Sequence, residues 1–152
     1  MTIKSSIFRL ALLLSLPLLL PACGERGRDF SLNDYRGKWL ILNYWAAWCG
    51  PCREEIAELN QLQRDHSSRL TVLAVNFDRV RGDELQEQAQ QLGIAFSLLE
   101  EDPADTLRLA RPAALPTSYL FDSEGRLAAK LVGPQTAASL LLRIDALADS
   151  AR

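Results

Sequence analysis

The hydrophobic and polar positions of the first half of the chain follow two alternating patterns. Trp39 to Trp45 and Leu70 to Phe77 are dense runs of β-forming residues without a charge, which is typical of strands buried on both faces of a sheet. Between them, Pro51 to about Asp65 repeats apolar residues at three-residue steps and keeps its charges on other faces, which predicts a helix. Pro51 itself suits a first helical position. This half therefore predicts strand, helix, strand.

The alternation continues after the second strand. Asp83 is placed to cap a helix that Gly93 ends, and Ile94 to Leu99 predicts a short strand. Residues 100–111 are rich in charge, and we interpret them as a solvated loop with one or two helical turns. These residues thus add a further helix and strand before the C-terminal part.

The C-terminal part changes to a hairpin. Ser118 to Phe121 and Leu127 to Val132 flank a turn and predict two paired strands. Thr136 then starts a last amphipathic helix. Alternation followed by a hairpin predicts an α/β fold, with a mixed central sheet and helices on both faces.

Composition and charge add limits to this picture. The chain has 152 residues, of which 48% are hydrophobic and 24% charged, enough for one domain with a full core. Its 17 Lys and Arg against 19 Asp and Glu give a net charge of −2. Without a basic excess, nucleic-acid binding is excluded as a main activity. We expect a monomer with one domain at residues 30–152.

The first 22 residues have the layout of a secretory signal. Lys4 and Arg9 supply positive charge, and Leu10 to Leu20 form an apolar run. A transmembrane helix needs about 20 apolar residues, roughly twice this run. We therefore interpret residues 1–22 as a signal peptide; a short uncleaved anchor is the alternative.

Leu20-Pro21-Ala22-Cys23 resembles the bacterial lipoprotein signal, in which the Cys is lipidated. The alternative is that Cys23 is a free thiol or a third redox cysteine. An odd thiol is a liability in an oxidising compartment, which favours lipidation. We expect a lipid anchor on Cys23, a tether at residues 23–29, and a domain that faces the periplasm from a bacterial membrane.

The remaining cysteines, Cys49 and Cys52, fall at the start of the predicted helix. There the free N–H groups and the helix dipole stabilise a thiolate, which is the nucleophilic form. Cys49 is expected at the exposed edge and Cys52 one turn further in, so that Cys49 can attack a disulfide and Cys52 can resolve it. Gly50 and Pro51 stiffen the turn and leave room for a substrate backbone. A bridge closing so small a loop constrains the unfolded chain weakly, so the pair indicates redox chemistry.

Two metal-binding alternatives fit this pair less well. A zinc site needs four ligands, and beyond the pair the exported part of the chain offers only His66, at a helix end. A copper-binding chaperone would need a nearby Met or His, but the single Met is Met1. We expect no metal, flavin or haem, only the redox-active disulfide.

Residues 45–52, Trp-Ala-Ala-Trp-Cys-Gly-Pro-Cys, resemble the active-site motif of thioredoxins, and the resemblance covers most of residues 30–148. Within that superfamily the chain resembles membrane-tethered periplasmic reductases of the TlpA/ResA/DsbE type. The motifs behind this narrower resemblance are Tyr35-Arg-Gly-Lys38, Cys52-Arg-Glu-Glu55 and a helix-and-strand segment around residues 81–100. It implies a thioredoxin-like fold with a TlpA-type insert.

The resemblance also assigns roles to single residues. Pro116 matches the family's cis-proline, which faces the cysteines, and a substrate strand pairs with backbone at Leu115. Trp48 flanks the reactive sulfur. Glu55 matches a family Glu that could relay protons to the thiols; the alternative is an ordinary first-turn acid favoured by the helix dipole.

One position departs from thioredoxin itself. Thioredoxins have a buried Asp six residues before the first Cys, which acts as a base toward the inner thiol. Asn43 occupies this position here and cannot take up a proton at neutral pH. Glu55 is the obvious substitute.

The resemblance implies a thiol–disulfide oxidoreductase that reduces protein disulfides. Because the periplasm is oxidising, a membrane electron donor of the DsbD type would have to restore the thiols. The Gly-Pro dipeptide favours a reductase over an oxidase. Apocytochrome c is the leading substrate, and general repair of periplasmic thiols is the runner-up. The alternatives from other classes are a thiol peroxidase of related fold and the copper-binding redox chaperone.

Overall fold

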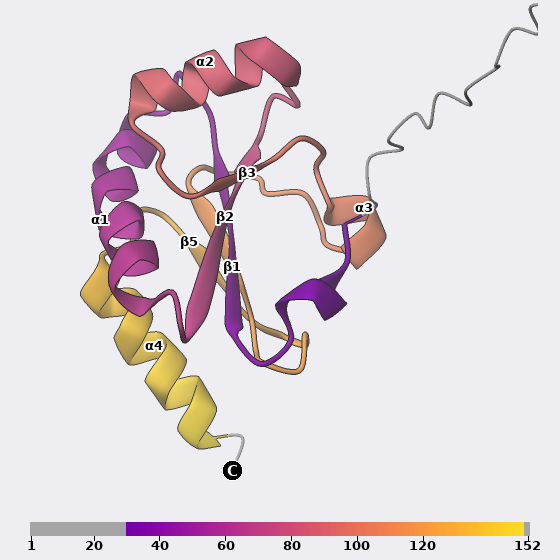
Figure 1. The fold of residues 1–152 in the computed structure, drawn as a ribbon, viewed down its shortest axis with the longest axis vertical. Coiled ribbons are helices and arrows are strands. Elements are labelled where there is room, and N and C mark those ends of the chain that lie inside the picture. The colour runs from indigo at the N-terminus through magenta and orange to yellow at the C-terminus, as the bar shows by residue number, and fades with distance from the viewer. Residues whose placement is uncertain (1–29, 151–152) are drawn as a thin grey trace, which may run out of the picture.

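The computed structural model describes residues 30–150, and its elements follow the predicted order (Figure 1). The elements are η1 (Leu32–Tyr35), β1 (Trp39–Trp45), α1 (Gly50–His66), β2 (Leu70–Asn76), α2 (Gly82–Leu92), β3 (Ser97–Leu99), α3 (Ala104–Leu107), β4 (Thr117–Phe121), β5 (Leu127–Val132) and α4 (Ala137–Ser150). The predicted signal, Cys23 and the tether lie outside the described residues. Within residues 30–150, no helix is long and apolar enough to cross a membrane.

The five strands form one mixed sheet in the order β3-β2-β1-β4-β5. β1 is central: it runs parallel to β2 and antiparallel to β4, while β3 extends the parallel side and β5 the antiparallel side. A central strand with neighbours on both sides has no exposed edge, and six of the seven residues of β1 are buried. The mixed sheet predicted from the alternating pattern and the hairpin is confirmed.

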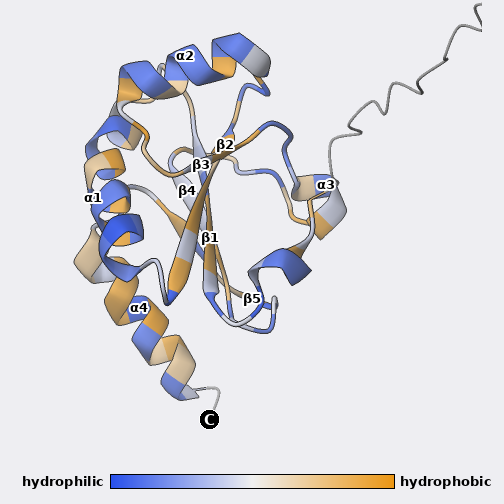
Figure 2. Cartoon of the chain, in the orientation of Figure 1, coloured by the Kyte–Doolittle hydropathy of each residue, from blue (hydrophilic) through white to orange (hydrophobic). Residues whose placement is uncertain are grey.

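The two faces of the sheet are covered differently (Figure 1). Alternate side chains of β1 point to opposite faces: Ile41 and Trp45 pack in one apolar cluster, and Leu40, Leu42 and Tyr44 in the other. The first cluster is closed by the apolar faces of α1, α2 and α4. The outer faces of α1 and α2 are mostly hydrophilic, whereas α4 is largely apolar and leaves Leu142 exposed (Figure 2). The second cluster is closed by η1, α3 and the loops around them. Helices therefore lie on both faces, but the three long ones share one face.

The start of α2 differs from the prediction. Asp83 lies inside the helix, which begins at Gly82, and the capping residue Arg81 makes no side-chain cap hydrogen bond. Instead, the N–H of Gly82 donates to Oε2 of Glu100 at 3.1 Å. The first-turn donor is thus satisfied from 18 residues away, which a local capping pattern does not reveal. Thr136 does cap α4: its Oγ1 accepts from the N–H of Ser139 at 3.1 Å.

The sequence suggested that the charged segment 100–111 is a solvated loop, but part of it is buried. Its Asp102 has a side chain only 5% exposed, and Oδ1 accepts hydrogen bonds from the Tyr44 hydroxyl at 2.6 Å and from the N–H of Ala104 at 3.0 Å. Arg79 and Arg111 lie 3.8 Å and 3.9 Å from Oδ2. Because a buried carboxylate is costly without partners, these contacts explain why Asp102 ties the segment to the sheet.

A disulfide at the start of helix α1 is the candidate active site

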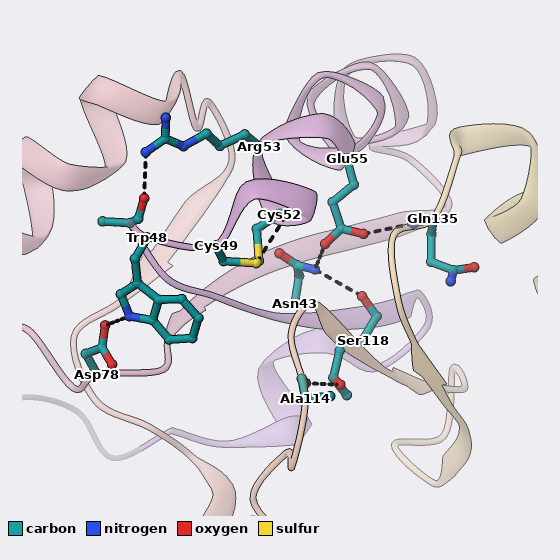
Figure 3. Close-up of a disulfide and its surroundings, with 12 residues drawn as sticks. Asn43, Trp48, Cys49, Cys52, Arg53, Glu55, Asp78, Ala114, Ser118 and Gln135 are labelled. Carbon is teal, nitrogen blue, oxygen red and sulfur yellow. Dashed lines mark hydrogen bonds between the residues drawn. A yellow bond between two sulfur atoms is a disulfide. The ribbon is translucent and has the colours of Figure 1, made fainter.

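Cys49 and Cys52 form a disulfide at the amino end of α1, with an S–S distance of 2.06 Å (Figure 3). Cys49 is the N-cap residue, and its Sγ accepts a hydrogen bond from the N–H of Cys52 at 3.2 Å. Pro51 occupies the first turn, where its missing N–H costs nothing. After reduction, the same N–H and the positive helix end favour a thiolate on Cys49.

Both cysteines are almost completely buried, but Cys49 is slightly more exposed than Cys52. Cys52 is fully buried, and Cys49 is 4% exposed rather than lying at an open edge as the sequence suggested. The cover comes from the apolar cluster that Cys49 joins with Trp45 and Ala46. Gly50 remains exposed, and a Cβ added there would meet no atom within 4 Å. A substrate can therefore approach over Gly50 and reach the outer sulfur first.

The side chain of Trp48 lies beside the disulfide (Figure 3). Its side chain is 66% exposed, although its indole N–H donates to Oδ2 of Asp78 at 2.8 Å. Its ring also packs edge-on against Phe77, with ring centroids 6.4 Å apart. An exposed tryptophan held at two points is a rigid apolar surface for a substrate chain.

The loop before β4 lies at the same end of the sheet. The Leu115–Pro116 peptide bond is cis, as the resemblance implied. Thr117, the next residue, pairs with Tyr44 near the end of β1, and β1 leads directly to the disulfide turn. The Thr117 hydroxyl donates to the Ala114 carbonyl at 2.8 Å and fixes the loop. The register therefore brings Leu115 and Pro116 to the end of the sheet where Cys49 lies.

Behind the disulfide lies a buried polar group centred on Asn43 (Figure 3). Its Nδ2 donates to Oε1 of Glu55 at 2.6 Å and to the Ser118 hydroxyl at 3.1 Å. The other carboxylate oxygen of Glu55 accepts the N–H of Gln135 at 2.9 Å. Glu55 and Asn43 are each 1% exposed. Glu55 is therefore not an ordinary exposed acid of the first turns.

The surroundings of Glu55 change its acidity. Burial raises the pKa of this carboxyl, while the hydrogen bonds from Gln135 and Asn43 act in the opposite direction and the net shift is upward. A cavity of about 260 Å³ lies beside it, lined by Glu54, Glu55, Glu58, Pro134, Gln135 and Thr136. A carboxyl with a raised pKa next to a cavity open to solvent is suited to taking up a proton inside and releasing it outside.

Several residues of this site could not be found by sequence reasoning. Ser118 and Gln135 reach Asn43 and Glu55 across 75 and 80 residues, and Asp78 fixes Trp48 across 30. The only sequence signal among them is Ser118, a polar residue in the buried strand β4. Residues 30–150 contain no group of three or more His, Cys, Asp or Glu side chains that could hold a metal ion.

Comparisons with known proteins agree with this geometry. Residues 14–130 match the model of the AhpC/TSA family. The thioredoxin-like protein YneN of Bacillus subtilis is 31% identical over 121 residues, covering 78% of this chain and 71% of that protein. The thiol-disulfide oxidoreductase ResA of Geobacillus thermodenitrificans is 28% identical over 122 residues, covering 80% of this chain and 70% of that protein.

Two crystal structures are similar in fold and sequence. A DsbF homologue from Corynebacterium diphtheriae superposes with a TM-score of 0.64 at 28% identity, covering 77% of this chain and 76% of that one. A thiol:disulfide interchange protein of the thioredoxin family from Chlorobium tepidum gives 0.61 at 27%, covering 78% and 85%. The fold, the cysteine pair and these matches together show that the chain belongs to the AhpC/TSA family, among its thioredoxin-like thiol–disulfide oxidoreductases.

Proposed function

We propose that this oxidoreductase works as a protein-disulfide reductase. The observation that carries the proposal is the arrangement of the pair, with Cys49 at the helix end beside an approach over Gly50 and Cys52 fully buried behind it. The Cys49 thiolate attacks one sulfur of the substrate disulfide and forms a mixed disulfide, and the other substrate sulfur leaves as a thiolate that takes up a proton. Cys52 then attacks Cys49 and releases the second substrate thiol. Two electrons and two protons pass to the substrate, and the enzyme is left oxidised.

We propose that Glu55 accepts the proton that Cys52 loses. Cys52 must lose its proton before it can attack Cys49, and Asn43 offers no base at this depth. The carboxylate of Glu55 is held by Asn43, its pKa is raised by burial, and the cavity beside it admits water. These features support a relay in which Glu55 accepts the proton and passes it to solvent; in this role Glu55 acts on the thiol from behind rather than on the substrate.

The substrate chain binds on two sides of Cys49. Exposed Trp48, Gly50 and Pro51 form one side. The backbone at Leu115, ahead of Pro116, forms the other and offers hydrogen bonds to an extended substrate segment. This arrangement suits a disulfide carried on an unfolded or extended polypeptide.

Location and partners complete the proposal. The signal at residues 1–22 and a lipid on Cys23 would hold the domain on the outer side of a bacterial membrane, with residues 23–29 as tether. A membrane donor of the DsbD type would return the pair to the dithiol. The resemblance to ResA-type reductases favours apocytochrome c as substrate, with general thiol repair second.

The test is to trap the substrate in the native host. Cys52→Ser leaves Cys49 able to attack but removes the resolving thiol, so mixed disulfides accumulate and mass spectrometry identifies the trapped proteins. The double variant Cys49→Ser/Cys52→Ser is the control. Trapped apocytochromes support the leading substrate, and many unrelated exported proteins support thiol repair. If nothing is trapped while Cys49 remains reduced, the proposal is wrong. Peroxide consumption or stoichiometric copper binding by the reduced protein would favour the alternative functions.

A further inference from the structure

Two arginines lie on the Trp48 side of the disulfide without a role in the exchange chemistry. Arg79 belongs to the loop that follows β2, where Phe77 donates its N–H to the Trp45 carbonyl at 2.8 Å and Asp78 holds the Trp48 indole. β2 is parallel to β1, so this loop and the disulfide turn leave the same edge of the sheet. The loop that carries Arg79 is therefore a neighbour of the reactive pair.

Arg111 reaches the same place from the loop that leads to Pro116. Its guanidinium lies 4.1 Å from the centre of the Phe77 ring and donates to the Phe77 carbonyl. Phe77 in turn packs against Trp48. Arg79 and Arg111 thus approach one surface from two segments that are far apart in the chain.

These arginines share a single buried counter-ion. Both face Oδ2 of Asp102, at 3.8 Å and 3.9 Å, and that oxygen accepts no hydrogen bond from the residues that the structure describes. Oδ1 is already used by Tyr44 and Ala104. The Asp102 side chain is 5% exposed, whereas those of Arg79 and Arg111 are 52% and 41% exposed. The negative charge is inside, and two positive charges with unused N–H donors face solvent.

The other charged side chains nearby are held by partners of their own. Asp78 adds one negative charge, but one of its oxygens accepts from the Trp48 indole. Arg53 adds one positive charge and donates to the Ala47 carbonyl at 2.8 Å, beside Trp48 (Figure 3). Arg81 and Glu101 pair with each other at 3.2 Å, and Glu100 accepts the N–H of Gly82. The two half-exposed guanidinium groups of Arg79 and Arg111 therefore stand against the single buried carboxylate of Asp102.

We propose that Arg79 and Arg111 form a subsite for a carboxylate of the substrate, so that the protein prefers disulfides flanked by Asp or Glu. A guanidinium fork binds a carboxylate through two parallel N–H donors, and both side chains have donors to spare. The inference rests on the proposed function, because it concerns the polypeptide that Cys49 attacks. Asp102 acts as a positioning residue that holds the two guanidinium groups beside Trp48.

The test compares two synthetic peptides with the same cystine and either Glu or Lys two residues from it. The pre-reduced full-length protein is mixed with each peptide, and the second-order rate of reduction is measured. We expect the Glu peptide to react about three to ten times faster at low ionic strength, as for partly exposed charge pairs, and the ratio to fall as salt is added.

Variants separate charge from structure. Arg111→Gln and Arg79→Asn should each lower the ratio, whereas Arg111→Lys keeps the charge and should retain most of it. Asn is chosen at position 79 because Arg79 has a φ of 60°, which Asn tolerates. Arg64→Gln is the matched control, since Arg64 is 69% exposed near the far end of α1.

Equal rates for the two peptides, or a ratio that survives the Arg79 and Arg111 variants together, would overturn the inference. In either case reduction of both peptides at a measurable rate leaves the proposed function intact. If neither peptide is reduced by the wild type, the proposed function itself fails. Thermal unfolding of each variant shows whether it is folded as the wild type is.

Discussion

Glutamine at position 55 removes a buried charge and keeps the shape of the side chain. Both carboxylate oxygens of Glu55 accept hydrogen bonds, from Asn43 Nδ2 and from the N–H of Gln135. A glutamine has only one acceptor oxygen, so one of the two donors loses its partner, at a cost of about 1.5–3 kcal/mol for a bond to a charged group. Against this, Glu55→Gln no longer requires a charge to be buried.

The pH dependence of the free energy of unfolding separates the effect of the Glu55 charge from the effect of the lost hydrogen bond. Burial raises the pKa of Glu55 above its ordinary value of 4.5, so the folded state holds this proton more tightly than the unfolded state. The stabilisation from that proton is complete below the unfolded pKa and is lost as the pH rises through the folded pKa. Its size is about 1.4 kcal/mol for each pH unit between the two pKa values. The stability of Glu55→Gln relative to wild type should therefore rise across this window and level off above it.

The assay is urea unfolding of the oxidised protein, followed by tryptophan fluorescence, at several pH values from 4 to 8. Glu54→Gln is the control, because Glu54 is exposed on the same turn of α1. A difference in the free energy of unfolding between Glu55→Gln and wild type that stays constant with pH would refute the raised pKa.

We also expect Glu55→Gln to slow the release of reduced substrate about a hundredfold, as loss of an acid–base group does, and to shift the thiol titration. An unchanged rate–pH profile removes Glu55 from the mechanism.

Two further predictions concern stability. Asp102→Ala should lower the free energy of unfolding by about 1–3 kcal/mol, because it leaves the Tyr44 hydroxyl without its acceptor, whereas the half-exposed guanidinium groups of Arg79 and Arg111 stay hydrated. Asp102→Asn should cost less because it keeps an acceptor for Tyr44, and equal losses in urea unfolding would contradict this account of the buried carboxylate. Leu59→Ala, at a fully buried position of α1, should cost about 2–5 kcal/mol, and a loss below 1 kcal/mol would show that the core between α1 and the sheet is not close-packed there.

The sequence predicted the order of elements because each strand and helix has its own periodic signal. β1 was predicted with its observed bounds, Trp39 and Trp45, since an uncharged run ends at both sides in polar or small residues. The disulfide pair was equally clear, because two cysteines at the start of a helix have a chemistry that depends on local structure alone.

Long-range contacts were the part that sequence reasoning could not supply. Asp102 was interpreted as solvated because the residues around it in the chain do not indicate that its hydrogen-bond partner is Tyr44, 58 residues away. The prediction that Asp83 caps α2 was wrong for the same reason, because the residue that accepts the N–H of Gly82 is Glu100, which follows β3. The resemblance to a family made Glu55 a candidate, but its hydrogen bonds from Asn43 and from Gln135, 80 residues away, are what show the carboxylate held inside the fold. Pairwise contacts of this kind depend on topology, not on local pattern.

The central claim is that the pair at the start of α1 exchanges electrons with a protein disulfide. The direct measurement is a single turnover of the pre-reduced full-length protein with an excess of a disulfide-containing protein, quenched with acid and analysed by mass spectrometry. The account predicts one Cys49–Cys52 disulfide formed for each substrate disulfide reduced, and a mixed disulfide on Cys49 that accumulates only in Cys52→Ser. Reduction of the substrate by Cys49→Ser at the wild-type rate would contradict it.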